Sequence, residues 1–411
     1  MTATADRLGS RGSAPAGPSR HSRLADPLVA RLRPYTTTIF AEMSALAVRT
    51  GSINLGQGFP DTDGPRSVLE AARQAIADGV NQYPPGPGNP ELRQAIAFAR
   101  ERDHGQVFDP DTQVLVTVGA TEALAAAVLG LLEPGDEVLL IEPHYDSYPP
   151  IIAMAGGRHR SVSLRPDADA RFALDLGEAA AAITPSTRMM IVNSPHNPTG
   201  TVLTRDELAG LARLAVEHDL VVLTDEVYEH LIFDGVEHVP LATFDGMAER
   251  TVTISSAGKS FNTTGWKIGW ACGPAPLIAA VRAAKQFLTY VGGAPFQPAI
   301  AHALRNEMAW VAELRASLQN KRDRLCAGLT AAGFGVFRPQ GTYFVMTDIR
   351  PLGASDGMRF CLDLPARAGV VAIPDEVFHD DPADGKPFVR FAFCKRDDVI
   401  DDAVQRLAGM R

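Results

Sequence analysis

The sequence predicts an α/β fold in which a mostly parallel central sheet carries helices on both faces and a smaller α+β domain follows. Three observations support this prediction. After Pro65, short apolar strands alternate with amphipathic helical stretches, which is typical of a parallel sheet covered by helices. From Phe334 onward, short apolar strands stand beside helical stretches without that alternation. A chain of 411 residues also exceeds what one hydrophobic core commonly serves, which favours two domains.

The first part of the chain is expected to lie outside the central sheet. Residues 1–26 are rich in Ala, Gly, Ser, Pro and Arg without apolar periodicity, so we predict a flexible tail. Residues 36–51 predict a helix that starts at a threonine and stops at Gly51, and a turn-rich stretch follows it. We predict a segment over 27–60 that joins the small domain, a large domain over 61–302, and a small domain over 303–411.

The central sheet is predicted from six apolar segments, which are QVLVTV, EVLLIE, RMMIVN, LVVLTDE, TVTISS and KIGWACG. Helices are expected to begin at Thr121 and at Arg205. A long helical stretch from about Pro298 to Leu329 should lead out of the large domain. The segments FGVFRPQGTYFVMTDI, VVAIP and FVRFAFC then predict the strands of the second domain.

Composition and charge exclude several classes of function. The formal net charge is -9 and the basic residues are scattered, so we expect no nucleic-acid partner. The apolar runs are too short to span a bilayer and no apolar signal core follows the first residues, so we expect no membrane partner and a cytoplasmic location. The four cysteines stand far apart without a CxxC pair, so we expect no disulfide framework and no metal site.

Polar clusters directly follow the predicted strands, where the ligand crevice of an open α/β sheet lies. They are VTVGATEAL, IEPHYDSY, NSPHNPTG, TDEVYEH and SSAGKSFNTTGWKIGW. In this order the clusters resemble those of the fold type I, class I aminotransferases that depend on pyridoxal 5'-phosphate (PLP), especially the kynurenine aminotransferase and glutamine transaminase K group. The resemblance runs from about Phe40 to the C-terminus. NQYPPGPG, VLVTVGATEA, DEVYEHL and FCKRDD are most similar to the actinobacterial N-succinyldiaminopimelate aminotransferases.

The resemblance implies a catalytic set of Lys259, Asp225 and Tyr228. An aldehyde cofactor needs an amine that condenses with it, gives way to the substrate amine, and then moves a proton; Lys259 is the candidate. Asp225 would face the pyridine nitrogen and keep it protonated, while Tyr228 and Asn197 would donate to the phenolic oxygen. Taken alone, these residues could be a surface lysine, a capping aspartate, a core tyrosine and an asparagine turn. Their order and spacing favour the cofactor site.

The phosphate of PLP needs hydroxyls, backbone N–H groups and positive charge. Gly119, Ala120 and Thr121 lie at a predicted strand-to-helix turn, where the helix N-terminus favours an anion. Ser256 and Lys267 resemble the hydroxyl and cationic contacts of the family. Tyr83 resembles the tyrosine that reaches the phosphate of the neighbouring subunit, which implies a homodimer with shared sites.

The resemblance also assigns a ring cover and a substrate end. Tyr145 stands where an aromatic ring stacks on the cofactor. Arg390 resembles the arginine that holds the substrate α-carboxylate through a two-point fork, although by itself it could be a strand residue in a surface ion pair. Asn197 would share in substrate binding, and Gly56 and Phe40 would form the wall above the substrate. We find no second cation for a distal carboxylate or succinyl group.

The expected activity is transamination between an amino acid and a 2-oxo acid. The resemblance favours N-succinyl-LL-2,6-diaminopimelate with 2-oxoglutarate or glutamate, in lysine biosynthesis. A kynurenine, glutamine or methionine aminotransferase and a cysteine-conjugate β-lyase remain alternatives on the same scaffold. A catalytically silent regulatory protein with the PLP fold is an alternative of another class. A dinucleotide-binding oxidoreductase is disfavoured because no predicted strand runs into GxGxxG.

Overall fold

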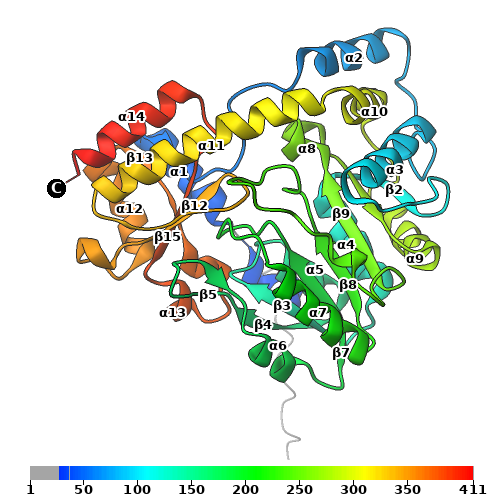
Figure 1. Ribbon diagram of the computed structural model, residues 1–411, viewed down its shortest axis with the longest axis horizontal. Helices are drawn as coiled ribbons and strands as arrows, with labels where there is room; N and C mark the ends of the chain where they lie inside the picture. The colour runs from blue at the N-terminus through cyan, green and yellow to red at the C-terminus, as the bar shows by residue number, and fades with distance from the viewer. Residues whose placement is uncertain (1–26, 37, 411) are drawn as a thin grey trace, which may run out of the picture.

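A computed structural model describes residues 27–36 and 38–410 of the chain. The predicted tail over residues 1–26 lies outside the described residues. The described part forms a large seven-stranded sheet flanked by helices and a second, smaller sheet beside it (Figure 1).

The large sheet has the strand order β2-β10-β9-β8-β7-β3-β4. Its strands are β2 (Val114–Val118), β3 (Glu137–Glu142), β4 (Arg158–Ser163), β7 (Thr187–Asn193), β8 (Val221–Asp225), β9 (Thr251–Ser256) and β10 (Ile268–Cys272). All neighbouring pairs are parallel except those made by β10, which runs antiparallel to β2 and to β9. The predicted mostly parallel sheet is therefore confirmed. Because β10 is reversed, its first residue lies at the edge where the parallel strands end.

Helices cover both faces of the large sheet because alternate side chains of each strand point to opposite faces. Val138 and Leu140 of β3 pack with α4 (Gly119–Leu131), α5 (Tyr148–Ala155) and α9 (Ala275–Lys285). Leu139 and Ile141 pack on the other face with α6 (Leu176–Ala182) and α7 (Arg205–Glu217). Near β2 and β10, a further cluster includes α2 (Arg66–Ala77), α3 (Pro90–His104) and α10 (Phe296–Asn306).

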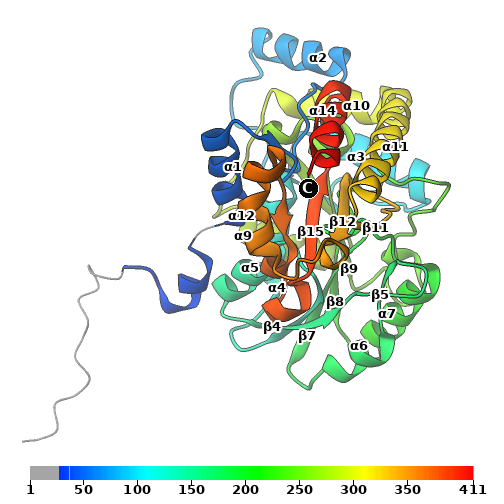
Figure 2. The ribbon, with the colours of Figure 1, turned by 90° about the vertical axis from the view of Figure 1, so that its left-hand side faces the viewer.

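The second sheet is antiparallel and has the order β11-β12-β15-β14. It comprises β11 (Gly335–Phe337), β12 (Phe344–Asp348), β14 (Ile373–Pro374) and β15 (Phe388–Ala392). Its core includes α12 (Gly357–Ala368), α14 (Asp397–Ala408) and α1 (Ile39–Thr50). The N-terminal β1 (Ile53–Asn54) pairs in parallel with β13 (Val370–Val371). The start of the chain thus packs with its C-terminal part (Figure 2).

Short elements complete the chain. They are η1 (Ala30–Tyr35), β5 (Arg165–Pro166), β6 (Phe172–Ala173), η2 (Leu241–Thr243), α8 (Ala257–Ser260), η3 (Thr264–Trp266), η4 (Arg350–Leu352), η5 (Asp375–Phe378) and α13 (Pro382–Gly385). Of these, α8, η3 and η5 carry side chains at or near the candidate site described below.

Three predicted helices compare as follows. The N-terminal helix is confirmed, because the Thr38 side chain accepts from Ala41 N at its start and Gly51 ends it with a left-handed φ of 62°. The helix predicted from Thr121 begins two residues earlier, at Gly119. The prediction of one long helix from about Pro298 to Leu329 is wrong.

Two helices, α10 and α11 (Met308–Ala331), meet at Glu307. The Asn306 side chain donates to His302 O over 3.0 Å, a bond that competes with the helical pattern and favours a helix end. Figure 1 shows α11 running from α10, beside the large sheet, toward the smaller sheet. The domain boundary placed at 302/303 falls inside α10, and it stays a prediction.

Candidate active site

A cavity opens where the parallel strands of the large sheet end. It is lined by Gly119, Ala120, Thr121, Leu124, Tyr145, Tyr148, Asn193, Asn197, Asp225, Val227, Tyr228, Ser256, Gly258, Lys259, Thr264 and Lys267. Asn193, Asp225 and Ser256 are the last residues of β7, β8 and β9, and Lys267 directly precedes the reversed β10. The sheet therefore gathers the polar clusters that the sequence places after its strands.

Asp225 is a buried carboxylate that faces the cavity. It accepts a hydrogen bond from the Tyr148 hydroxyl over 2.8 Å and one from Val227 N over 3.3 Å. Burial raises the pKa of Asp225 to about 6, against the opposing effect of the Tyr148 hydrogen bond. No cation of the described chain lies within ion-pair distance of this carboxylate. A protonated ring nitrogen placed beside it would supply the missing positive charge.

Lys259 lies in α8, directly after β9. Its Nζ donates to the Tyr343 hydroxyl over 2.9 Å, and that hydroxyl donates in turn to Gly58 O. Burial lowers the pKa of Lys259 to about 8. An amine whose pKa is lowered in this way has a larger neutral fraction near neutral pH and is a better nucleophile and base.

Tyr228 and Asn197 flank this amine. The Lys259 Nζ lies 5.6 Å from the centroid of the Tyr228 ring, and that ring stands edge-on to Tyr343 with centroids 5.1 Å apart. Burial raises the pKa of Tyr228 above its ordinary value, so its hydroxyl is a proton donor. Asn197 is held by its backbone N–H, which donates to the Asn193 side chain over 2.8 Å.

The far end of the cavity is built for an anion. The N-terminus of α4 opens toward it at Gly119, whose φ is 72°. A Cβ at Gly119 would stand 3.1 Å from the Lys267 Nζ, so a side chain here would crowd the ammonium. Ser256 adds a hydroxyl that accepts from Gly258 N and donates to Ile268 O, each over 3.3 Å. A helix N-terminus, an ammonium and a hydroxyl together fit a phosphate group.

Arg390 on β15 extends the cavity toward the small domain. Its Nη1 donates to the Asn197 side chain over 2.9 Å and its Nη2 to Gly56 O over 3.0 Å, while its buried Nε has no hydrogen-bond partner. Burial lowers the pKa of Arg390 to about 10, which leaves the guanidinium charged at neutral pH. The rings of Phe40, Phe344 and Phe378 have centroids 5.2, 4.0 and 5.3 Å from its Cζ.

Tyr83 differs from the other predicted site residues. It does not line the cavity, its exposed fraction is 82%, and its ring stands 5.8 Å from that of Tyr290. The predicted cofactor residues of the large domain, apart from Tyr83, are thus brought together within one chain. The role of each in binding stays a prediction.

Three polar residues at the site are not predicted from the sequence. Tyr148 and Asn193 line the cavity and lie in the same polar clusters as Tyr145 and Asn197, whereas Tyr343 contacts Lys259. The signal for Asn193 is its position as the last residue of an apolar strand. Tyr343 follows a turn in the second domain, and nothing local in the sequence relates it to Lys259.

Comparison with known proteins places this site in a family. A family model described as aminotransferase class I and II matches residues 50–407. The chain belongs to the class I and II aminotransferases. It is 64% identical over 389 residues to the Mycobacterium tuberculosis protein named "Probable N-succinyldiaminopimelate aminotransferase DapC", covering 92% of this chain and 98% of that one. It is 40% identical over 384 residues to the methionine aminotransferase of Escherichia coli, covering 93% and 98%.

Solved structures agree with this assignment. The structure of N-succinyldiaminopimelate aminotransferase from Mycobacterium tuberculosis superimposes with a TM-score of 0.92, covering 93% of this aminotransferase and 100% of that chain. An aspartate aminotransferase from Thermus thermophilus, 36% identical, superimposes with a TM-score of 0.86, covering 93% and 99%. The predicted PLP fold type I and the predicted transferase class are confirmed.

Aminotransferases of this class use PLP, and the cavity fits that cofactor on three independent observations. The buried Asp225 carboxylate has no cation of the described residues within ion-pair distance, the α4 N-terminus with Lys267 and Ser256 offers donors and positive charge to a phosphate, and the Lys259 amine of lowered pKa lines the same cavity. No helix of the described residues is long and apolar enough to cross a membrane.

Proposed function

We propose that this aminotransferase moves an amino group between N-succinyl-LL-2,6-diaminopimelate and 2-oxoglutarate, with glutamate as the partner amino acid. The observation that carries the proposal is the 64% identity over nearly the whole chain to the probable mycobacterial enzyme of that name. Relatives named for methionine and kynurenine stand at 40% and 37% identity. The cytoplasmic location that the sequence predicts belongs to the same proposal.

In the proposed site, bound PLP supplies an electron-accepting ring that stabilises negative charge on the substrate Cα. Asp225 would keep positive charge at the ring nitrogen, which would strengthen the ring as an acceptor. Lys259 would hold the cofactor, and its Nζ would take the proton from the substrate Cα and later return one. Tyr343 positions this amine through the 2.9 Å hydrogen bond at Nζ. The proton transfer needs a base whose pKa is near the working pH of the enzyme. The Lys259 amine, whose pKa is lowered to about 8, meets this need.

Arg390 is proposed to bind the α-carboxylate of every substrate. Its guanidinium lies among aromatic rings with no carboxylate of the described chain within ion-pair distance, and Asn197 beside it offers a second polar group. A carboxylate held at two points fixes which face of Cα meets Lys259. Phe40 and Gly56 then border the distal part of the substrate, with the segment 289–295 at the opening.

The proposed active unit is a homodimer in which Tyr83 reaches the phosphate of the other chain. Three observations support this proposal. Tyr83 is exposed, it lies outside its own cavity, and its ring packs on Tyr290 in a segment whose Phe287 is also exposed, at 84%. Soluble monomers seldom leave such rings in water together. Complementation between Lys259→Ala and Tyr83→Phe chains, which yields one intact site per mixed dimer, would test it.

Half-reaction spectroscopy tests the substrate. The PLP form is mixed with N-succinyl-LL-diaminopimelate, glutamate, methionine and kynurenine, and the loss of the cofactor's absorbance is followed. We expect the first two to react with the largest kcat/KM values. A kcat/KM for methionine or kynurenine that is ten times larger, equivalent to roughly 1.4 kcal/mol, would overturn the proposed substrate in favour of that amino acid.

Two further readouts separate the remaining alternatives. Release of pyruvate and ammonia from cysteine conjugates at a rate above transamination would identify a β-lyase, and no half-reaction with any amino acid would identify a silent protein. Borohydride reduction followed by peptide mapping should tag the Lys259 peptide. A tag on Lys267 or Lys285 instead would contradict the assigned attachment site.

A further inference from the structure

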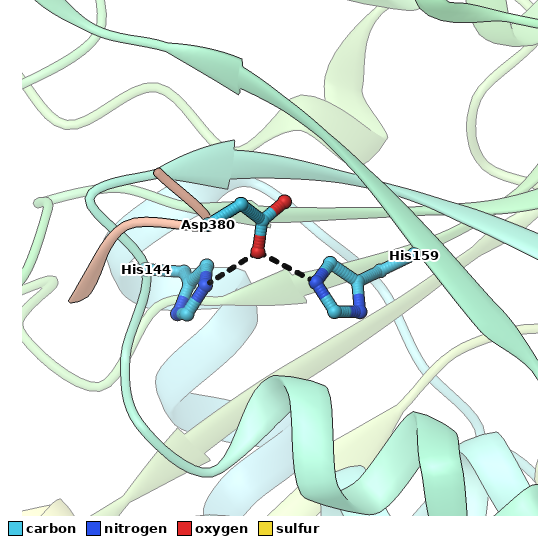
Figure 3. Close-up of side chains that lie close together, drawn as sticks. All are labelled: His144, His159 and Asp380. Carbon is cyan, nitrogen blue, oxygen red and sulfur yellow. Dashed lines mark hydrogen bonds and ion pairs between the residues drawn. The ribbon is translucent and has the colours of Figure 1, made fainter. Parts of the chain in front are cut away.

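Three metal-ligating side chains converge at the β3–β4 edge of the large sheet (Figure 3). His144 follows β3, His159 lies in β4, and Asp380 follows η5. Asp380 Oδ1 lies 2.7 Å from His159 Nε2 and 3.6 Å from His144 Nε2. The ligating atoms of all three residues lie within 4.8 Å of one another.

His144 supplies an independent observation. Its side chain is more than nine-tenths buried, at 7% exposure, and neither ring nitrogen has a hydrogen-bond partner. A buried polar atom without a partner costs free energy. Figure 3 shows the His144 ring turned toward the Asp380 oxygen that also faces His159. The unsatisfied nitrogen is thus directed at the space between the three side chains.

The separations of the ligand atoms are close to those around one ion. With metal–ligand bonds of about 2.0 to 2.2 Å at a tetrahedral angle, two ligand atoms stand roughly 3.3 to 3.6 Å apart. Asp380 Oδ1 lies 3.6 Å from His144 Nε2 and 2.7 Å from His159 Nε2, the second being a hydrogen-bond distance. Small movements of Asp380, whose side chain is 43% exposed, would equalise them.

The surrounding backbone holds the ligands in register. His144 N donates to Phe378 O over 2.8 Å, and Asp380 N donates to a Glu142 carboxylate oxygen over 2.9 Å. The Ser163 hydroxyl donates to the other oxygen of Glu142 over 2.8 Å. Supporting bonds of this kind orient metal ligands and are part of most metal sites.

We propose that His144, His159 and Asp380 bind one divalent transition-metal ion of the Zn²⁺ class per chain. Two imidazoles with one carboxylate suit Zn²⁺, Co²⁺ or Ni²⁺, whereas Mg²⁺ and Ca²⁺ prefer all-oxygen sites. The buried His144 forms the floor of the site. The partly exposed His159 and Asp380 leave the remaining coordination positions open to water. This inference rests on local geometry and is independent of the substrate proposal.

The position of the ion indicates a structural role near the active site. His144 immediately precedes Tyr145, which lines the cavity, and the same loop leads to Tyr148, which donates to Asp225. Asp380 belongs to the segment that carries Phe378, whose ring packs 5.3 Å from the Arg390 guanidinium carbon. An ion bound here fastens the cofactor side of the cavity to its substrate side. None of its ligands touches the reacting atoms.

Calorimetry on the untagged PLP-bound enzyme tests the proposal, after chelator treatment and dialysis. ZnCl₂ should bind with a stoichiometry of one ion per chain, CoCl₂ should give visible d–d absorption, and MgCl₂ should not compete. His159→Gln and Asp380→Asn should each weaken Zn²⁺ binding by at least about tenfold. Because both positions are partly exposed, these variants should fold, and the buried His144 need not be changed.

The matched control is His302→Gln. His302 is 39% exposed and pairs with Glu307 over 3.7 Å. It is therefore a histidine–carboxylate pair like His159 and Asp380, but without a second imidazole. It should leave Zn²⁺ affinity unchanged. Zn²⁺ should also raise the Tm of the wild type and of the control, and leave that of His159→Gln unmoved. A wild type that binds no Zn²⁺, or equal binding by the two histidine variants, would overturn the proposal and leave a hydrogen-bonded cluster.

Discussion

Asp225 and Glu226 are consecutive buried carboxylates that face two differently built regions of the molecule. Asp225 points into the active-site cavity, where its hydrogen-bond partners are neutral. Glu226 points away from it and lies 2.9 Å from Arg100 and 3.2 Å from His238. Burial raises the pKa of Asp225 to about 6. For Glu226 burial also raises the pKa, but Arg100 and His238 together outweigh burial and lower the pKa to about 2.

In the region behind the cavity, the buried charged side chains pair with one another. Arg100 also contacts Glu229 over 2.5 Å, and His104 contacts the same carboxylate over 2.8 Å. The Ser255 hydroxyl donates to Glu229 as well. In the cavity, by contrast, Asp225 lacks a cation and Arg390 lacks an anion among the described residues. In the structural network, charged groups of the chain pair with one another. In the binding site, they lack partners within the chain and are available to pair with a ligand.

Removing the central cation of the structural network should have the largest effect. Arg100→Met leaves two buried carboxylates unpaired and should lower the free energy of unfolding by about 3 to 5 kcal/mol. Arg102→Met is the control, because Arg102 is 27% exposed and pairs with its neighbour Asp103, so its loss should cost less than about 1 kcal/mol. Denaturant unfolding measures both. Equal midpoints for the two variants would remove the distinction between the regions.

In the PLP-bound enzyme, Asp225→Asn should act mainly on the chemical step. It removes the negative charge that faces the ring nitrogen, so kcat should fall by about 10² to 10³-fold, equivalent to roughly 2.7 to 4 kcal/mol, with PLP still bound. Glu226→Gln, one residue on, should lower stability while changing the kcat of the folded enzyme less than about tenfold. Steady-state kcat values and denaturant unfolding curves of the two variants measure these effects. Near-normal turnover by Asp225→Asn would exclude the assigned role.

The same two carboxylates should respond to pH in opposite directions. The folded pKa of Asp225, about 6, exceeds its ordinary 3.8, so the cofactor-free fold loses stability as pH rises through that interval, by up to about 3 kcal/mol. Glu226, with a folded pKa of about 2 against an ordinary 4.5, contributes stability above pH 4.5 that is lost as pH falls toward 2.

Unfolding of the PLP-free protein at several pH values provides the measurement. Near pH 7.5 the Asp225→Asn variant should be more stable than the wild type, and the difference should shrink toward about pH 4. A constant difference across this range would show that the carboxyl group does not titrate differently on folding.

Arg390→Ala should produce a smaller effect that is uniform across substrates. A two-point contact to a carboxylate contributes about 1.5 to 3 kcal/mol, so kcat/KM for every amino acid and keto acid should fall at least roughly tenfold. Phe40→Leu is the comparison, and it should re-rank the substrates instead. If Arg390→Ala spares glutamate and abolishes one other substrate, Arg390 binds the distal group and the proposed orientation is reversed.

Much of the fold and of the cofactor side of the site could be predicted from the sequence because the signals are local. Apolar segments with turn-forming clusters after them predict strand ends, and the strand ends of a parallel sheet meet at one edge. That rule places Lys259, Asp225 and Asn197 near this edge, and the family resemblance supplies their roles. The break between α10 and α11 is not predicted by that rule, because the backbone leaves the helical conformation at the single residue Glu307, with φ of -109° and ψ of 19°, while the apolar pattern continues.

The sequence by itself therefore determined the class of the fold and the candidates for the cofactor end, whose side chains each belong to a strand end. Only the tertiary structure decided which distant side chains complete them. Tyr343 reaches Lys259 across 84 positions, Arg390 reaches Gly56 O across 334, and His159 reaches Asp380 across 221. The physical reason is that periodicity reports burial and secondary structure locally, whereas these contacts depend on the packing of two sheets formed by separate parts of the chain.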